Sequence, residues 1–192
     1  MKKVRLEDLK GLAAYEKLRE DFRRRIIELK KNRRLAVGDK VSLLFENRDT
    51  VIFQIQEMLR AERITDLEKI REEIEVYNSL IPDAGELSAT LFLEIEEQGR
   101  IREELLKFLG IDEGVYLKIG NRTIRARFES GHSKEDKISA VQYVRFPFNP
   151  DEIRAFVAGE EGAEIFIDHP NYQARVTVGE ETRKALIEDL TA

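Results

Sequence analysis

Hydrophobic residues recur along the first part of the chain with the spacing of a helix. The apolar positions between residues 12 and 29 follow steps of three and four: Leu12, Tyr15, Leu18, Phe22, Ile26 and Leu29. This spacing predicts an amphipathic helix over residues 11–34. Its last turns hold a basic cluster, which suits the negative end of the helix dipole and which we expect to face solvent: Arg23, Arg24, Arg25, Lys30, Lys31, Arg33 and Arg34.

A second apolar segment covers residues 51–64 and follows a buried strand predicted at residues 41–45. Its apolar side chains surround most of the helix circumference, which indicates a central helix. The same turns also carry polar side chains: Gln54, Gln56, Glu57, Arg60, Glu62 and Arg63. Because a buried charge costs several kcal/mol unless it is paired, we predict that Glu57 and Arg60 are largely buried and bound to each other or to neighbouring polar groups.

The rest of the chain shows both helical and strand patterns. A third helix is expected to begin at Thr65-Asp66, with Glu68 completing a capping box, and to end near residue 81. Further strands are predicted at 87–95 (with one solvated side), 115–119, 123–128, 138–148, 164–167 and 172–178, and further helices at 100–109, from 151 and at 180–190. This pattern indicates one α+β domain over residues 1–192, with a mostly antiparallel sheet, several packed helices and a long N-terminal helix. The one candidate internal boundary lies at residues 82–85.

Composition narrows the class of protein. The 192 residues include 33 basic and 38 acidic side chains, for a net charge of −5, and 42% of them are hydrophobic, which is enough for a core. The chain has no Cys, which excludes disulfides, thiolate catalysis and Cys-ligated metal centres. With no signal-peptide pattern and no long apolar run, we expect a cytoplasmic protein that holds no cofactor or metal. The 37% of charged residues, with two Met and no Trp, is typical of a thermophile.

A pair of aromatic and imidazole side chains near the C-terminus could carry chemistry. His169 lies in Asp168-His169-Pro170 at the end of a short predicted strand, and Tyr172 follows it. A histidine beside a carboxylate could serve as a general base or as a metal ligand. The alternative is a turn residue whose ring bonds to the main chain. We expect the other histidine, His132, to be exposed in a polar loop.

A third polar group is weaker evidence for chemistry. Asp136-Lys137 precedes Ser139, and Gln142, Tyr143 and Arg145 follow. The chain has neither the Gly-x-Ser-x-Gly elbow nor the Ser-x-x-Lys motif of hydrolases. It also has no Gly-rich phosphate-binding fingerprint, so a P-loop or standard dinucleotide-binding enzyme is not expected.

Several segments, in the same order along the chain, resemble the DUF3501 family of uncharacterised prokaryotic proteins. They are Leu43-Leu44-Phe45-Glu46-Asn47-Arg48-Asp49-Thr50, residues 54–63, Tyr77-Asn78-Ser79-Leu80-Ile81-Pro82, Asp136-Lys137 with Ser139-Ala140-Val141, Arg145-Phe146 and Ile167-Asp168-His169-Pro170. The family has no assigned activity, so the resemblance transfers no catalytic residue. It implies a role beside redox or peroxide-defence machinery, such as rubrerythrin-like and iron–sulfur proteins.

We therefore expect an accessory protein that binds a protein partner. The alternative is a small-ligand-binding protein or enzyme, with one polar pocket formed by Gln54, Glu57, Arg60, Glu62, Arg63, His169 and Tyr172. The two hypotheses differ in whether these side chains converge on a cavity. Nucleic-acid binding at the basic end of the first helix is the weakest possibility, because the chain is acidic and that cluster has no interleaved aromatic residues.

Overall fold

The computed structural model describes residues 1–96, 98–129, 133–134 and 137–192. Its helices and strands follow the predicted order closely. The helices are α1 (Leu12–Lys31), α2 (Arg48–Ala61), α3 (Leu67–Asn78), α4 (Ile101–Leu106), α5 (Pro150–Ala158) and α6 (Glu180–Thr191), with short 3-10 turns η1 (Leu6–Asp8), η2 (Gln98–Arg100) and η3 (Ile111–Glu113). The strands are β1 (Arg34–Ala36), β2 (Val41–Glu46), β3 (Glu86–Leu93), β4 (Val115–Ile119), β5 (Arg122–Arg125), β6 (Arg127–Phe128), β7 (Ser133–Lys134), β8 (Lys137–Ile138), β9 (Val141–Pro147), β10 (Ala163–His169) and β11 (Tyr172–Thr177).

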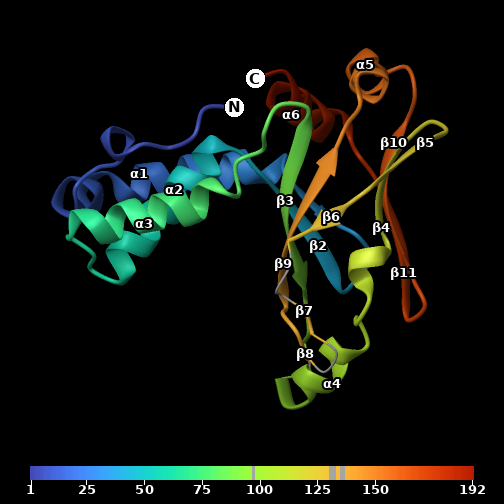
Figure 1. The fold of residues 1–192 in the computed structure, drawn as a ribbon, viewed down its shortest axis with the longest axis horizontal. Helices are drawn as coiled ribbons and strands as arrows, with labels where there is room; N and C mark the ends of the chain where they lie inside the picture. Colours follow the sequence, from blue (N-terminus) through green and yellow to red (C-terminus); the bar gives the residue numbers. More distant parts are fainter. Residues whose placement is uncertain (97, 130–132, 135–136) are drawn as a thin grey trace.

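Two antiparallel sheets and a set of three helices build the molecule (Figure 1). Sheet A has the strand order β1-β2-β3-β9-β6, and sheet B has the order β11-β10-β4-β5. The strands β7 and β8 form a separate pair. The expected α+β class, with mostly antiparallel pairing and a long N-terminal helix, is confirmed.

The larger hydrophobic core lies between the two sheets. Alternate residues of the strands point into it, as the sequence pattern required, and several are fully buried: Leu43, Leu87, Leu91, Leu117, Ile119, Phe146 and Ile165. Phe156 of α5 and Leu186 of α6 cover the same core. The sheets and these two helices therefore fold around one apolar interior.

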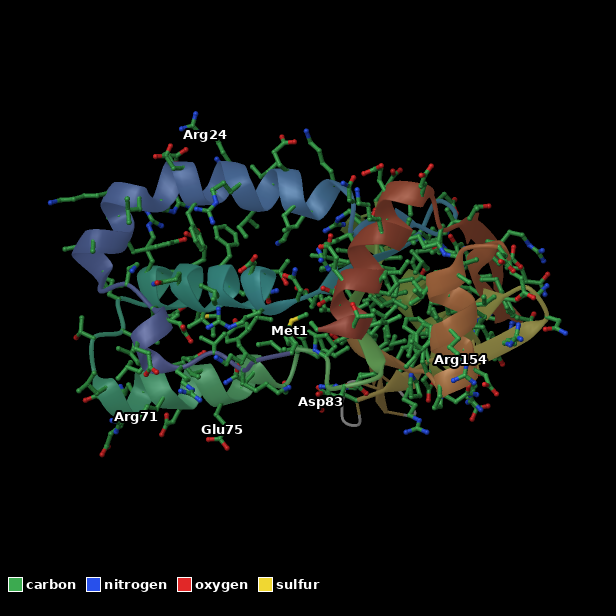
Figure 2. The ribbon with its side chains drawn as sticks, turned by 90° about the horizontal axis from the view of Figure 1, so that it is seen from above. Met1, Arg24, Arg71, Glu75, Asp83 and Arg154 are labelled. Carbon is green, nitrogen blue, oxygen red and sulfur yellow. The ribbon has the colours of Figure 1, made fainter. Side chains whose placement is uncertain are left out.

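The helices α1, α2 and α3 form what we call the helical arm. They lie side by side, with α2 in the middle, and the arm extends away from the sheets (Figure 2). A second core joins α2, α3 and the first residues of the chain: Val4, Val51, Ile55, Leu59, Ile74, Leu80 and Ile81. The side chain of Gln56 fixes the N-terminal segment, because its amide exchanges hydrogen bonds with the N–H and C=O of Lys10 at 2.6 and 3.1 Å.

The basic cluster at the end of α1 is only partly a solvated face, which corrects the sequence prediction. The helix ends at Lys31, and Arg34 already belongs to β1. Arg33 is buried, with 3% of its side chain exposed, and its guanidinium binds both carboxylate oxygens of Asp189 in α6. This pair joins the root of the arm, by which we mean its end next to the sheets, to the last helix of the chain.

Strand β3 also differs from its prediction, because neither of its faces is solvated. Ser88 and Thr90 lie on the side away from the core and are nonetheless buried. The reason is tertiary: β3 is the central strand of sheet A, and the end of the arm next to the sheets covers this side, where Thr90 donates to Glu46, which also accepts from Gln54 of α2. At the start of α3, Asp66 rather than Thr65 is the cap, since its carboxylate accepts from the N–H groups of Glu68 and Lys69.

Two further observations describe the chain as a whole. The amino group of Met1 donates to the C=O of Ala192 at 3.4 Å, so the two ends meet beside α6 (Figure 1). Among the described residues, the helices lack the combination of length and apolarity that crossing a membrane requires.

Candidate functional site

Glu57 and Arg60 of α2 bind partners on α1. Glu57 accepts a hydrogen bond from the Tyr15 hydroxyl at 2.8 Å and two from the Arg19 guanidinium, each at 2.8 Å. Arg60 binds the carboxylate of Glu16, with a shortest distance of 2.7 Å. Both side chains are engaged, but not with each other. The Glu57 side chain is 27% exposed and that of Arg60 is 37% exposed, so neither is as deeply buried as the sequence suggested.

The electrostatics of this cluster match a structural role. The Arg19 guanidinium holds the pKa of Glu57 below its ordinary value, against the opposing effect of partial burial, and the Tyr15 hydroxyl acts in the same direction. Burial and the neighbouring carboxylate raise the pKa of Tyr15. The carboxylate therefore stays ionised and fully hydrogen-bonded, which favours a clamp between α1 and α2.

Gln54 belongs to a different cluster, at the root of the arm. Its amide donates to the carboxylate of Glu46 at 3.0 Å. Glu46, only 1% exposed, also accepts from the hydroxyls of Thr50 and Thr90. This network links α2 to β2 and β3 and leaves the Glu46 oxygens occupied by protein donors.

Glu62 and Arg63 lie at the exposed C-terminal end of α2. Arg63 has φ +53°, the left-handed conformation in which helices commonly end. Among the described residues, they form no hydrogen bond or ion pair with the α1 partners of Glu57 and Arg60. Their positions are explained by helix termination.

His169 is the last residue of β10 and Tyr172 is the first residue of β11, so the two lie on either side of the turn that joins these strands. The His169 ring is 4% exposed, with Nε2 2.8 Å from the C=O of Leu109 and Nδ1 accepting the N–H of Asn171 at 3.2 Å. The Tyr172 hydroxyl donates to the C=O of Val37 at 2.7 Å, and burial raises the pKa of this phenol. Both rings support main-chain turns.

The candidate ligand-binding residues therefore do not gather around one cavity. Gln54, Glu57 and Arg60 bind Glu46 or α1, and Glu62 and Arg63 lie at the exposed end of α2. His169 binds the main chain of Leu109 and Asn171, and Tyr172 binds the main chain of Val37. Any role for them beyond these contacts remains a prediction. Among the described residues, no group of three or more His, Asp or Glu side chains is arranged to hold a metal ion.

The polar residues between positions 136 and 145 do not form one cluster either. Ser139 accepts from the N–H of Val141, and the buried Gln142 donates to the C=O of Ser139. Arg145 binds Glu86 and Asp83. Asp136 and His132 lie outside the described residues.

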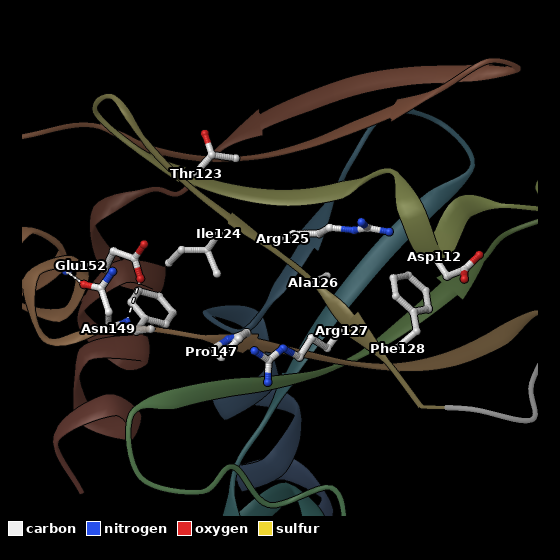
Figure 3. Close-up of a pocket in the computed structure, with 11 residues that line it drawn as sticks. Asp112, Thr123, Ile124, Arg125, Ala126, Arg127, Phe128, Pro147, Asn149 and Glu152 are labelled. Carbon is white, nitrogen blue, oxygen red and sulfur yellow. Dashed lines mark hydrogen bonds between the residues drawn. The ribbon is translucent and has the colours of Figure 1, made fainter.

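A groove with a largely polar lining lies between the two sheets (Figure 3). It has a volume of about 810 Å³ and is lined by Asp112, Thr123, Ile124, Arg125, Ala126, Arg127, Phe128, Pro147, Phe148, Asn149 and Glu152. Six of these residues are consecutive, so one wall of the groove is the strand segment 123–128. Asn149 and Glu152 lie at one end, and Asp112 and Phe128 at the other.

The groove opens because one strand pairing stops. Strand segment 122–128 belongs to sheet B through β5 and to sheet A through β6, which pairs with β9 as Arg127↔Arg145 and Phe128↔Val144. Continuing this register would place Arg125 opposite Pro147. Proline has no N–H to donate, and the chain then turns into α5, whose cap is Asn149. The two strands therefore separate, and the groove fills the gap.

The charged side chains of the groove differ in whether they already have hydrogen-bond or ion-pair partners. Glu152 forms the capping box of α5 with Asn149, so it is engaged. Arg125 is exposed and reaches Glu113 only at 3.8 Å. Arg127 is exposed, and the part of the chain that the structure describes contains no ion pair for it. Two arginines are thus available to an incoming acidic group.

The local sequence pattern does not distinguish these groove residues from other strand residues. Arg125 and Arg127 alternate with the buried Ile124 and Ala126, which is an ordinary strand pattern. The available signal was Pro147, because a proline in a strand indicates an edge or the end of pairing. Its meaning depends on the strand that lies opposite, which the sequence alone did not show.

Two antiparallel sheets sharing one core, with a projecting helical arm, define the class of this α+β protein. The chain belongs to DUF3501, a family of proteins of unknown function, whose model matches residues 3–190. It is similar to the crystal structure of a novel protein of unknown function from Burkholderia pseudomallei K96243, with 31% sequence identity, a TM-score of 0.92, and coverage of 98% of this chain and 100% of that chain. No curated protein matches it. The resemblance found in the sequence is confirmed.

Proposed function

We propose that this protein is an accessory protein that binds a protein partner and that the groove between the sheets is its binding surface. The observation that carries this proposal is the groove itself, an open concave surface of about 810 Å³ beside β5, the edge strand of sheet B. Its wall carries Arg125, whose ion pair with Glu113 is long at 3.8 Å, and Arg127, which has no ion pair among the described residues.

The other polar clusters support the proposal by contrast. Glu57, Glu46 and His169 each have their polar atoms occupied by neighbouring protein groups. Each cluster also holds two elements of the fold together. A binding role is thus better matched by the groove than by these internal networks.

The family resemblance adds a candidate class of partner. A partner from redox or peroxide-defence machinery would bring its own redox centre, since this chain has no Cys. The protein would then contribute a docking surface. This part of the proposal depends on the resemblance, whereas the place of binding depends on the groove.

A displayed library of ten-residue peptides tests the proposal with the full chain as bait. Peptides that bind the parent should lose at least tenfold in affinity for the double variant Arg125→Ser/Arg127→Ser. The matched control is Arg154→Ser/Arg175→Ser, which removes two exposed arginines elsewhere and should bind as the parent does. Failure to enrich any peptide, or equal binding to both variants, would show that the groove is not the binding surface.

A further inference from the structure

The free edge of β5 faces the groove, and we propose that the partner binds there by adding a strand to sheet B through an extended segment that alternates apolar and acidic residues. This inference rests on the proposed function. It adds the mode of binding and the sequence pattern of the partner segment.

The alternation of main-chain hydrogen bonds along β5 shows which of its N–H and C=O groups are free. In an antiparallel pair, both main-chain groups of a residue face the same neighbour, and successive residues alternate between the two sides. The N–H of Ala126 donates to the C=O of Val115 at 2.9 Å, in register with the β4–β5 ladder, so the even-numbered residues face β4. The N–H and C=O groups of Thr123 and Arg125 therefore point away from β4.

The next residues of the same segment face the opposite strand. The N–H of Glu129 donates to the C=O of Tyr143 at 3.0 Å, so the odd-numbered residues 127 and 129 face β9. Thr123 and Arg125 are also odd-numbered, so their main-chain groups point to the same side. However, β9 ends at Pro147, so no strand lies opposite them. Within the described residues, their main-chain groups have no partner on this side. Unpaired strand edges of this kind bind extended peptides by main-chain pairing.

The side chains around this edge define what an added strand should contain. Ile124, Ala126 and Phe148 are buried and form the inner side of the groove, whereas Thr123, Arg125 and Arg127 face outward. Residues of an added strand alternate between the same two sides. Inward residues would meet apolar groups and outward residues would meet two guanidinium groups. Apolar residues alternating with Asp or Glu fit both sides.

The length of the edge sets the length of the bound segment. The free edge comprises the residues of the segment that β9 does not pair, from Arg122 to Ala126, which span about 13 Å at the usual rise of a strand. An added strand of roughly five residues, close to the typical strand length, would cover it. A ten-residue peptide is therefore long enough to cover the groove.

Proline substitutions separate main-chain pairing from side-chain contacts. Thr123→Pro removes the N–H that faces the groove but keeps the ladder with β4, since that ladder uses the even-numbered residues. Thr177→Pro is the matched control: the N–H of Val178 donates to the C=O of Ala163, so Thr177 has its N–H on the free edge of β11. We expect Thr123→Pro to weaken binding of the selected peptides at least tenfold and Thr177→Pro to leave it unchanged. Circular dichroism of both variants confirms that they fold.

N-methylation of the best peptide provides a measurement that does not change the protein. In an added strand, only every second peptide N–H faces β5. Methylation should therefore weaken binding at alternate positions and leave the intervening positions unaffected. Selected sequences should also show acidic residues with a period of two.

The outcomes distinguish the two proposals. If peptide binding requires Arg125 and Arg127 but tolerates Thr123→Pro and shows no alternation on N-methylation, the groove is a binding surface and strand addition is wrong. If the purified protein forms a dimer that Thr123→Pro dissociates, the occupant is a second copy of this chain and the partner-peptide proposal is overturned. If no peptide binds, both proposals fail.

Discussion

The buried pair between Arg33 and Asp189 should dominate the response of this protein to mutation. Both side chains are 3% exposed, and two hydrogen bonds join the guanidinium to the carboxylate. Arg33→Met leaves the carboxylate buried without its cation, which typically costs about 3–5 kcal/mol. Since small domains have a total free energy of unfolding of about 5–15 kcal/mol, this single substitution should remove a large share of the stability.

The pH dependence of the variant adds a second measurable result. Burial raises the pKa of Asp189 above its ordinary value, and the Arg33 guanidinium opposes this rise. Without Arg33 the pKa of Asp189 in the folded protein should rise further. Above the unfolded pKa of about 3.9, the unfolded chain then binds fewer protons than the folded protein, so stability falls as pH rises toward the folded pKa. Arg33→Met should therefore lose less stability at pH 5 than at pH 7.

Chemical denaturation at both pH values measures these differences. The double variant Arg33→Met/Asp189→Leu replaces the ion pair by apolar groups and should recover most of the lost free energy, because no charge remains buried. Arg24→Ala, which removes an exposed cation from α1, should stay within about 1 kcal/mol of the parent. A loss below about 1 kcal/mol for Arg33→Met at pH 7, or a double variant no more stable than Arg33→Met, would refute this account of the pair.

Three other substitutions test the helical arm. Arg60→Ala should lower the free energy of unfolding by only about 0–1 kcal/mol, because its pair with Glu16 is exposed; a loss similar to that of Arg33→Met would contradict this. Tyr15→Phe should cost about 1.5–3 kcal/mol through its bond to the Glu57 carboxylate, and an NMR titration should show a higher pKa for Glu57 than in the parent; an unchanged pKa would argue against this bond. Arg63→Gly should stabilise the protein by about 0.5–1 kcal/mol, since glycine adopts φ +53° without strain, and a lower melting temperature would disprove it.

Periodicity located the elements of the fold because their burial is local in sequence. The alternation in β9 and the cap at Asn149 before Pro150 are examples, since both are complete within a few residues. The burial of Arg33 was not accessible in this way, because its partner Asp189 lies 156 positions away. The exposed neighbours of Arg33 on α1 give no sign of this difference.

The candidate site illustrates the same limit. The polar residues of α2 are unusual in the sequence, but their partners on α1 are not: Arg19 and Glu16 are two of many charges on that helix, and Tyr15 belongs to its apolar stripe. The groove depends on the register that would oppose Arg125 to Pro147. Register between strands far apart in the chain follows from packing of the whole sheet, and no local pattern contains it.

The distance along the chain between Arg33 and Asp189 also orders events during synthesis. At about 5–20 residues per second, a ribosome takes roughly 8–30 seconds to add the 156 positions that separate them. The core of the helical arm draws on residues from the first half of the chain, so it can assemble within that interval. The Glu46 network can also form within that interval, but the contact between Arg33 and Asp189 cannot form until α6 emerges. During synthesis there is therefore a stage at which the arm can be folded while Arg33 is still hydrated, because α6 has not yet been made.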